Sequence, residues 1–422
     1  MGILLKNAVL LDANYDNAPL DVLVEGREIK AIGKGLSAEQ EIDLTGYTLL
    51  PGFIDAHIHV ATKEGTFPDE ALLAWAENGV TTVRELGMLS TMPMDQYAAW
   101  IKEQNTRPET ARLIATGKYI DIAGGYGCGP EPNKVVGNVV KDIAGAEKMV
   151  ELAHSLGFPG IKIGISDGMP GSPRMSNEMI AAIGAKCKEL GMFTACHIGT
   201  SASLSDMVSG GIGEAGHTPN DIMPQALIEE MVKKGVPMDT TVGDPDKAME
   251  PPPGMEFPGG PIGPGTPGGM PGGPMGPGGP GGMPGGPMGP GSPGGMDPKK
   301  MAEQKKAQNK NMRSNLKRFY DAGGKIVLGT DLIHSKDFKK DAIIPTIEMK
   351  QLVESGIPFN EAIKAGTISA AEVCGTDQEE GTIEVGKLAN LIAVKGTVEP
   401  DFEILKDVKF VMHYGTIIKS CI

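Results

Sequence analysis

The chain has 422 residues and a formal net charge of −14, from 39 Lys and Arg residues against 53 Asp and Glu residues. This acidic balance, without a long Lys/Arg run, argues against nucleic acid or an anionic membrane surface as the partner and favours a small-molecule substrate. The length exceeds one ordinary core unless the fold is an α/β barrel, so one large domain with a smaller one is the simplest expectation.

The chain start and the cysteines predict a soluble, cytoplasmic protein. Residues 1–6 lack the basic region, long apolar stretch and cleavage site of a secretory signal. No segment approaches the ~18 uninterrupted apolar residues that a membrane helix needs. The cysteines are odd in number and scattered, which suits reduced thiols better than a disulfide frame or a zinc knuckle. They are Cys128, Cys187, Cys196, Cys374 and Cys421.

The elements fall into a small β module followed by repeated βα units. Apolar runs between Asn, Asp and Gly predict strands at residues 3–11, 20–25, 28–32 and 47–50. From Pro51 on, short apolar runs alternate with helical segments, which is typical of a parallel sheet. Eight of these runs, enough to close a (β/α)8 barrel, are predicted strands. They are 53–59, 81–85, 112–116, 160–165, 193–197, 214–217, 236–242 and 326–331.

Helical spacing of apolar residues predicts helices between the strands and a helical stretch after them. The clearest are 68–77, 144–156, 177–190 and 224–234, followed by 344–371. The tail returns to predicted strands at 391–394, 408–413 and 416–419, and we expect these to rejoin the N-terminal β module.

A Pro/Gly/Met-rich insert at about 251–297 interrupts the plan after the seventh predicted strand. It repeats with a 13-residue period that aligns Met270, Met283 and Met296. Gly does not occupy every third position, which excludes collagen. Such a composition buries too little apolar surface to offset chain entropy, so a disordered loop is expected.

Two histidines at the end of the first barrel strand are the first candidate metal ligands. In a strand, residues i and i+2 project from the same face, so His57 and His59 point together, with Asp55 close by as a supporting partner. Two imidazoles can offer two nitrogens to one metal ion. Taken alone, a His-x-His pair is equally consistent with core or surface histidines.

Further candidates lie on four other predicted strands. Lys162 lies in an apolar run, where a lysine is costly unless it is paired, neutralised or modified. The alternative is a lysine that reaches out of a strand end. His197 and His217 end two strands, as satisfied core histidines also do, and Asp331 ends the eighth, where a helix N-cap is the alternative. Together the six residues converge on the mouth of one barrel.

These motifs together resemble the metal-dependent amidohydrolase superfamily, in particular its imidazolonepropionase-like and prolidase-like branch. The resemblance covers nearly the whole chain except the insert. The residues that carry it are 51–59, 79–85, 161–163, the two strand-end histidines, 329–331 and the closing run 381–392.

The resemblance implies a (β/α)8 TIM barrel of residues 51–377 and a β-sandwich of residues 1–50 plus 378–422. It also implies two divalent metal ions, zinc in the first place, with iron, manganese or nickel as alternatives. The implied ligands are His57, His59 and Asp331 for one ion, His197 and His217 for the other, and an N-carboxylated Lys162 between them. A hydroxide bridging the two ions would attack the substrate, with Asp331 as the catalytic proton acceptor.

Several residues depart from the family pattern or fall outside it. Relatives often carry Gly-Gly-His after the third strand, where this chain has Tyr126, so Tyr126 is predicted to change what the pocket binds. Arg174 and Lys118 are basic candidates for a substrate carboxylate, and His334 is close enough to Asp331 to reach the mouth. Glu85 stands where Asp is common, Asn390 replaces an Asp of the closing motif, and His154 and His413 lie outside the ligand set.

The leading hypothesis is a hydrolase of an amide, cyclic amide or dipeptide-like C–N bond. A mononuclear-metal deaminase of the same fold is the nearest alternative. Lys162 separates the two, because the deaminase type needs no bridging lysine. It usually has a catalytic Glu near its third His, whereas Ile198 to Ser201 follow His197 here. A third reading is a non-catalytic scaffold that binds partners through its Met-rich repeat. A homo-oligomer is expected.

Overall fold

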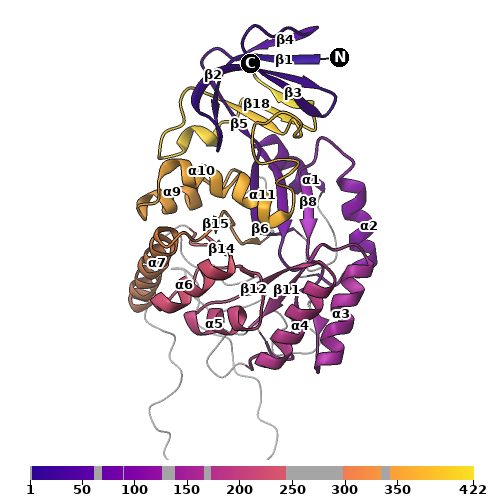
Figure 1. Ribbon diagram of the computed structural model, residues 1–422, viewed down its shortest axis with the longest axis vertical. Helices are drawn as coiled ribbons and strands as arrows, with labels where there is room; N and C mark the ends of the chain where they lie inside the picture. The colour runs from indigo at the N-terminus through magenta and orange to yellow at the C-terminus, as the bar shows by residue number, and fades with distance from the viewer. Residues whose placement is uncertain are drawn as a thin grey trace, which may run out of the picture. The chain divides into compact units, whose positions relative to one another are not determined.

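The structure is a computed structural model that describes residues 2–60, 69–88, 90–125, 138–165, 173–243, 298–333 and 343–422 (Figure 1). The chain divides into two units, one of Met1–Asp244 with Gln308–Ile422 and one of Pro245–Ala307. In the second unit the described residues are 298–307, which begin helix α7 (Pro298–Asp321). The predicted disordered insert at 251–297 lies outside the described residues.

Both ends of the chain contribute to one eight-stranded sheet, in which the indigo and yellow strands of Figure 1 lie side by side. The strand order is β19-β18-β17-β5-β1-β2-β3, with β4 paired to β1. Leu391 to Lys395 pair antiparallel with Pro51 to Tyr47, so the predicted return of the tail to the N-terminal module is confirmed. The strands are β1 (Gly2–Leu11), β2 (Asp16–Glu25), β3 (Glu28–Gly33), β4 (Gln40–Asp43), β5 (Tyr47–Pro51), β17 (Leu391–Lys395), β18 (Phe410–His413) and β19 (Thr416–Ser420).

This terminal sheet has an apolar core made from both chain ends. Leu5, Leu10 and Leu49 from the N-terminal strands pack in one cluster with Leu391 and Phe410 from the tail. Because neither end buries these side chains alone, the two ends stabilise each other. Strand β4 was not predicted, since its sequence is polar and only its parallel pairing with β1 defines it.

The parallel strands form two further sheets, in the orders β16-β6-β7-β8 and β10-β9-β11-β12-β13-β14-β15. Strands β13, β14 and β15 are two residues long, shorter than predicted, and β9, β10 and β16 are additional. The bounds are β6 (Phe53–His59), β7 (Val80–Glu85), β8 (Arg112–Ala115), β9 (Ile120–Asp121), β10 (Asn138–Val139), β11 (Gly160–Gly164), β12 (Phe193–His197), β13 (Glu214–Ala215), β14 (Met238–Asp239), β15 (Ile326–Val327) and β16 (Leu332–Ile333).

Backbone hydrogen bonds connect the first and last of these strands. Ala56 in β6 donates its N–H to Leu328 O at 3.0 Å, and Asp331 donates to His57 O at 2.7 Å. The segment that follows β15 therefore runs beside β6. At the other end of the four-stranded sheet, Met88 forms an isolated parallel bridge with Lys118. The arrangement is a TIM-barrel-like α/β fold.

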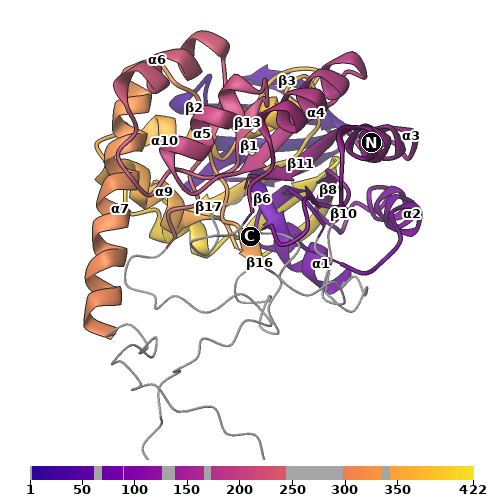
Figure 2. The same cartoon turned by 90° about the horizontal axis from the view of Figure 1, so that it is seen from below.

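Helices pack against the parallel strands, as Figure 2 shows for α3 and α4 beside β11. Polar residues define where some of them begin, since Asp142 accepts from Gly145 N and Ser176 accepts from Met179 N. The helices are α1 (Asp69–Glu77), α2 (Met94–Gln104), α3 (Ile143–Ser155), α4 (Asn177–Glu189), α5 (Ser201–Ser209), α6 (Gln225–Lys234), α7, α9 (Thr346–Glu354), α10 (Phe359–Ala365) and α11 (Ile368–Cys374), with a short 3-10 helix, η2 (Glu403–Lys406).

The predicted helical stretch 344–371 is three helices rather than one. Gly356 adopts φ +87° and Pro358 precedes α10, so the chain turns between α9 and α10. Thr367 interrupts it again with a non-helical backbone before α11. These breaks bring α11 under β6, where Ala370 and Ala371 pack against Ile54 and Ala56.

Candidate metal centre

The His-x-His pair lies on β6, whose seven residues are all buried. His59 Nε2 lies 3.1 Å from Asp331 Oδ1, and His57 Nε2 lies 3.5 Å from the same oxygen. One ligand atom from each of the three residues lies within 4.8 Å of the others, so the group has the spacing to hold a metal ion. The structure therefore brings together the three residues that the sequence assigned to one ion.

Asp331 reaches this position through a strained turn after β15. Its φ of +54° is uncommon for a residue other than glycine, and such strain persists where the surroundings fix the backbone. Asp55 supplies part of that constraint. One of its oxygens accepts from Thr330 N at 3.1 Å, and the other accepts from Thr330 Oγ1 at 2.6 Å. Asp55 thus supports the turn that presents Asp331.

The two other histidines lie next to this group. The ring centroid of His217 is 4.9 Å from that of His57 and 4.4 Å from that of His197. His217 follows β13 by two residues, and its Nδ1 lies 3.0 Å from Thr241 Oγ1. Four histidines from the ends of three strands, β6, β12 and β13, thus form one continuous cluster.

Lys162 lies in the middle of β11 and is buried, with 1% of its surface exposed. Its Nζ has no hydrogen-bond partner among the described residues. Burial lowers the pKa of Lys162, against the opposing charges of Asp239 and Asp331. A Cβ at Gly216 would lie 2.2 Å from this nitrogen, so glycine leaves room there that no other residue would. Among the described residues the amine is thus an unsatisfied buried group, packed where only glycine fits at position 216.

The electrostatics of the cluster suit a divalent cation. Burial lowers the pKa of His57 and of His217 well below the ordinary value, which keeps both imidazoles neutral and able to ligate. Desolvation opposes the ionisation of Asp331, but His57, His217 and His59 hold its pKa well below the usual range. Two orphaned atoms, His57 Nε2 and Lys162 Nζ, face this arrangement. Together they fit a metal centre.

Asp239, in β14, is a site residue that the sequence analysis missed. Its carboxylate is fully buried, and Oδ2 lies 3.2 Å from His57 Nδ1. The signal was present, because Asp239 sits inside the predicted strand 236–242 as Lys162 sits inside 160–165, and a buried acid needs the same explanation as a buried lysine.

The remaining predicted residues fall in two groups. Tyr126 and His334 lie outside the described residues. Arg174 is on the surface, where its Nη2 lies 2.6 Å from Asp206 Oδ2 and 39% of its side chain is exposed. Lys118 is half-buried, and this burial lowers the pKa of its amine. Their roles as substrate contacts stay predictions.

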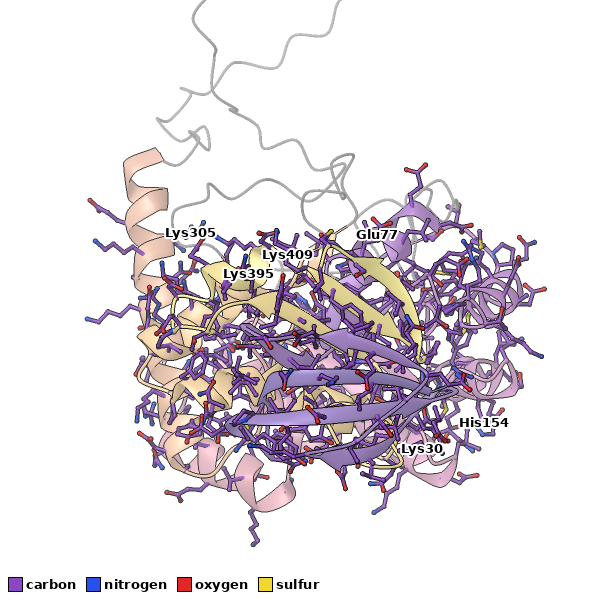
Figure 3. All side chains as sticks on the ribbon, turned by 90° about the horizontal axis from the view of Figure 1, so that it is seen from above. Lys30, Glu77, His154, Lys305, Lys395 and Lys409 are labelled. Atoms are coloured by element: carbon purple, nitrogen blue, oxygen red, sulfur yellow. The ribbon has the colours of Figure 1, made fainter. Side chains whose placement is uncertain are left out.

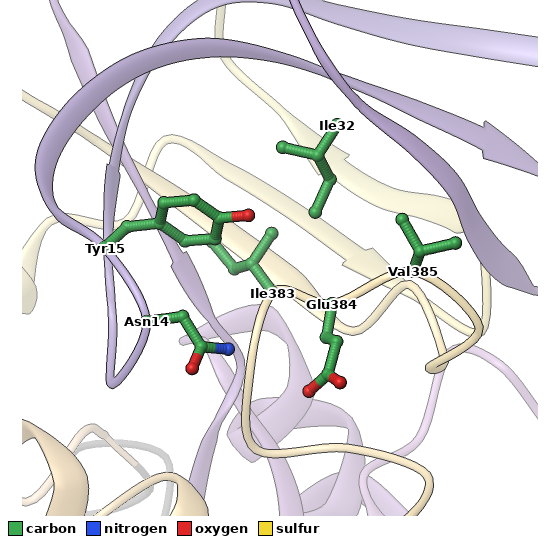
Figure 4. Close-up of a pocket in the computed structure, with 6 residues that line it drawn as sticks. All are labelled: Asn14, Tyr15, Ile32, Ile383, Glu384 and Val385. Carbon is green, nitrogen blue, oxygen red and sulfur yellow. The ribbon is translucent and has the colours of Figure 1, made fainter.

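The two histidines set aside earlier are placed away from the cluster. His154 is exposed on α3, at the edge of the view in Figure 3. His413, in β18, is buried with its Nδ1 2.9 Å from Pro108 O. A cavity of about 500 Å³ in the terminal sheet also lies apart, and no candidate ligand lines it. Figure 4 shows that its wall comes from Asn14, Tyr15, Ile32, Ile383, Glu384 and Val385.

No helix in the part of the chain that the structure describes combines the length and the apolar character needed to cross a bilayer.

The fold and the site define a class of protein, a TIM-barrel-like α/β protein with a histidine-rich, metal-competent cluster. Comparison of the sequence with known protein families narrows this class to one family. The model of the Amidohydrolase family matches residues 48–250 and 301–419, most of the chain. The chain belongs to the amidohydrolase family, as the sequence motifs indicated, and this family implies dependence on divalent metal.

Curated relatives match over parts of their length. A dihydroorotase from Lactobacillus gasseri is 28% identical over 168 residues, which are 38% of this chain and 36% of the relative. An allantoinase from Enterococcus faecalis is 40% identical over 87 residues, 19% and 18% of the two chains. An adenine deaminase from Bacillus pumilus is 40% identical over 83 residues, 19% and 14%. The chain thus matches well under half of each of these relatives.

Solved structures match over the whole chain and share its fold. A prolidase complexed with N-methylphosphonate-L-proline superposes with a TM-score of 0.75 at 22% identity, with both chains covered completely. A Xaa-Pro dipeptidase with bound methionine gives 0.73 at 20% identity, also with full coverage. An ochratoxinase from A. niger gives 0.73 at 15% identity, covering 99% and 96%.

Proposed function

We propose that the protein is a metal-dependent hydrolase of an amide, cyclic amide or dipeptide-like C–N bond. The observation that carries the proposal is Lys162, a fully buried amine that has no hydrogen-bond partner in the described part of the chain and lies near four histidines and an aspartate. A scaffold gains nothing from such a group, because an unsatisfied buried amine costs stability. A metal centre gives it a purpose.

The ligand roles follow from the positions of the side chains. His57, His59 and Asp331 would hold one ion, and His197 and His217 the other. The amine of Lys162, whose pKa burial lowers, would add to carbon dioxide in its neutral form with loss of one proton and become a carbamate, whose two oxygens could serve both ions. A side chain at position 216 would collide with the Lys162 nitrogen, and Gly216 avoids this.

Two bound divalent ions would supply an activated water and a polarised substrate carbonyl. The contribution of the chain is to hold the proton that this water loses. The contacts of Asp331 support this role, since its carboxylate lies beside His57 and His59 and 32% of its side chain is exposed. From there the proton would pass to the leaving nitrogen.

A mononuclear deaminase is the second candidate, and the local match to an adenine deaminase favours it. A single ion on the His57, His59 and Asp331 group would be enough for that chemistry. It would leave the burial of Lys162 unexplained, which is why the binuclear hydrolase is preferred.

The proposal extends to the frame of the site. We propose that the two parallel sheets close into one (β/α)8 barrel of residues 51–377, and that residues 1–50 and 378–422 form a β-sandwich domain on it. The hydrogen bonds between the β6 and β15 segments support closure. A small-molecule substrate follows from the chemistry, whereas zinc as the metal, a cytoplasmic location and a homo-oligomer stay predictions.

The test is elemental analysis of the native protein beside Lys162→Ala, with Lys325→Ala as a matched control at a surface ion pair. We expect about two equivalents of divalent metal in the native protein and the control, and a sharp loss in Lys162→Ala. After incubation with carbon-13-labelled bicarbonate, a carbamate carbon signal should appear in the native protein and in Lys325→Ala but not in Lys162→Ala. One equivalent that survives Lys162→Ala would favour the deaminase, and none in any protein would favour the scaffold.

A further inference from the structure

Strand β14 supplies none of the six proposed ligands, yet the end of this strand contacts two of the histidines. We propose that Asp239 and Thr241 are positioning residues, which hold the imidazoles of His57 and His217 in the orientation that metal binding requires. This inference rests on the proposed metal centre and adds two residues to it.

The contact of Asp239 is with the side of His57 that faces away from Asp331. His57 Nδ1 lies 3.2 Å from Asp239 Oδ2, while His57 Nε2 lies 3.5 Å from Asp331 Oδ1. Asp239 is fully buried, and neither of its oxygens has a partner of full hydrogen-bond geometry among the described residues. A buried carboxylate is costly unless a partner compensates it, and the N–H of His57 is a donor in reach, in addition to the carboxyl group of Glu214.

Thr241 does the same for His217 with a neutral group. Its Oγ1 lies 3.0 Å from His217 Nδ1. His59 completes the pattern, since its Nδ1 lies 3.0 Å from Gly87 O. Three histidines of the cluster thus have Nδ1 occupied by an oxygen from outside the ligand set. For His57 and His59 the acceptor oxygen favours the tautomer with the proton on Nδ1, which leaves Nε2 to ligate. The Thr241 hydroxyl can donate or accept, so it orients the ring of His217.

The backbone around Thr241 is built to hold this position. Thr241 adopts φ +41°, a genuine outlier for a β-branched residue. Its N–H donates to Gly329 O at 3.1 Å, and the next two N–H groups, of Val242 and Gly243, donate to the carboxylate of Glu348 at 3.0 and 2.5 Å. Strained backbone that is held by hydrogen bonds from neighbouring segments is common at functional sites, where side chains must be held in a defined orientation.

The two contacts should differ in strength, because their chemistry differs. A carboxylate orients the ring and also raises the electron density of the imidazole, whereas a hydroxyl only orients it. Asp239 also interacts electrostatically with two buried basic side chains, Arg84 and Lys162. Loss of Asp239 should therefore weaken metal binding more than loss of the Thr241 hydroxyl.

The experiment compares Asp239→Asn, Thr241→Val and Thr241→Ser in the full chain loaded with Co²⁺. Asparagine keeps the shape of aspartate, and valine keeps the β-branch that the strained backbone already tolerates. Serine keeps the hydroxyl and serves as the conservative rescue. We would measure release of Co²⁺ to a chelator, the visible absorption of the bound Co²⁺, and the melting temperature of each metal-free protein.

We expect release to be about 10- to 100-fold faster in Asp239→Asn, smaller but measurable acceleration in Thr241→Val, and native behaviour in Thr241→Ser. The Co²⁺ absorption should shift in the first two, with metal-free melting temperatures near the native value. Native release rates and spectra in Asp239→Asn and Thr241→Val would overturn the inference. So would a stoichiometry one ion lower in Asp239→Asn at saturating Co²⁺, because Asp239 would then be a ligand. A native protein that binds no Co²⁺ would instead refute the proposed metal centre.

Discussion

Two cations are fully buried inside the parallel strands, Arg84 and Lys162, and their surroundings differ completely. Arg84, in β7, donates Nε to Ala56 O at 2.8 Å and Nη1 to Val373 O at 2.9 Å. Its guanidinium also meets both carboxylate oxygens of Glu214, one of them at 2.9 Å. Lys162, in β11, has no hydrogen-bond partner for Nζ among the described residues.

The difference separates structural from functional burial. Arg84 is compensated: burial opposes its charge, but the neighbouring Glu214 outweighs this and raises the pKa of the guanidinium. Glu214 is buried as well, and burial raises its pKa to about 7. Lys162 has the charges of Asp239, Asp331 and Glu214 near it, but among the described residues its Nζ makes no hydrogen bond to any of them. A buried charged group whose hydrogen-bond and ion-pair partners are all present has a structural role. A buried charged group without such partners indicates a site that binds a ligand.

The strongest way to test this contrast is to remove the compensated cation. Arg84→Met should destabilise the metal-free protein by about 3–5 kcal/mol, because Glu214 would remain as a buried carboxylate without its partner. Urea unfolding followed by circular dichroism measures the change. The double variant Arg84→Met with Glu214→Leu should recover most of the loss. A loss below about 1 kcal/mol in the single variant would show that the ion pair is not structural.

Removal of the uncompensated cation, Lys162, should increase the free energy of unfolding of the metal-free protein. Lys162→Met replaces an unsatisfied amine by an apolar side chain of similar length, so the metal-free protein should gain about 1–3 kcal/mol, the cost of an orphaned buried polar group. The same urea experiment measures it, with the native protein stripped by chelator as the reference. Destabilisation by several kcal/mol would mean that Lys162 has a structural partner, and the contrast with Arg84 would collapse.

A third buried charge gives a smaller and pH-dependent effect. Glu348, in α9, has backbone N–H groups as partners, and burial raises its pKa from 4.5 to about 7. A raised carboxyl pKa means that the folded state binds the proton more tightly than the unfolded state. The stabilisation is therefore complete below about pH 4.5 and is lost as the pH rises to about 7.

Glu348→Gln removes one titrating group, so the fall in unfolding free energy between pH 5 and 7.5 should be shallower than in the native protein, by about 1 kcal/mol or more. Urea unfolding of both metal-free proteins at the two pH values measures the slopes. Asp55, whose pKa burial also raises to about 7, contributes equally to both proteins and cancels. Parallel slopes would show that Glu348 is ionised throughout this range.

Much of the arrangement of this protein is determined by the sequence itself. The alternation of β6 places His57 and His59 on one face because a strand has a period of two residues. Lys162 could be singled out as costly from its apolar neighbours alone, and the strand ends indicated where His197, His217 and Asp331 would meet. These inferences needed only local patterns and the rule that parallel strands end at one edge of a sheet.

Other features were decided by contacts between distant segments. The proximity of Asp239 to His57 depends on which strands are neighbours inside the fold, and no local pattern encodes that. The same holds for Thr241 and His217, and for the strained backbone of Thr241 and Asp331, which their neighbours fix. The shared sheet of the two chain ends, with β4 in it, depends on pairing partners far away in the chain.

The sequence analysis identified Lys162 as a costly buried lysine but did not single out Arg84, which is equally buried. Only the tertiary structure shows that Arg84 has a carboxylate partner and that Lys162 has none among the residues described, because satisfaction of a buried charge depends on atoms from other strands brought within about 3 Å. Residue type and local pattern determine where charges are buried. Tertiary packing decides whether each buried charge is paired within the protein or is left to bind a ligand.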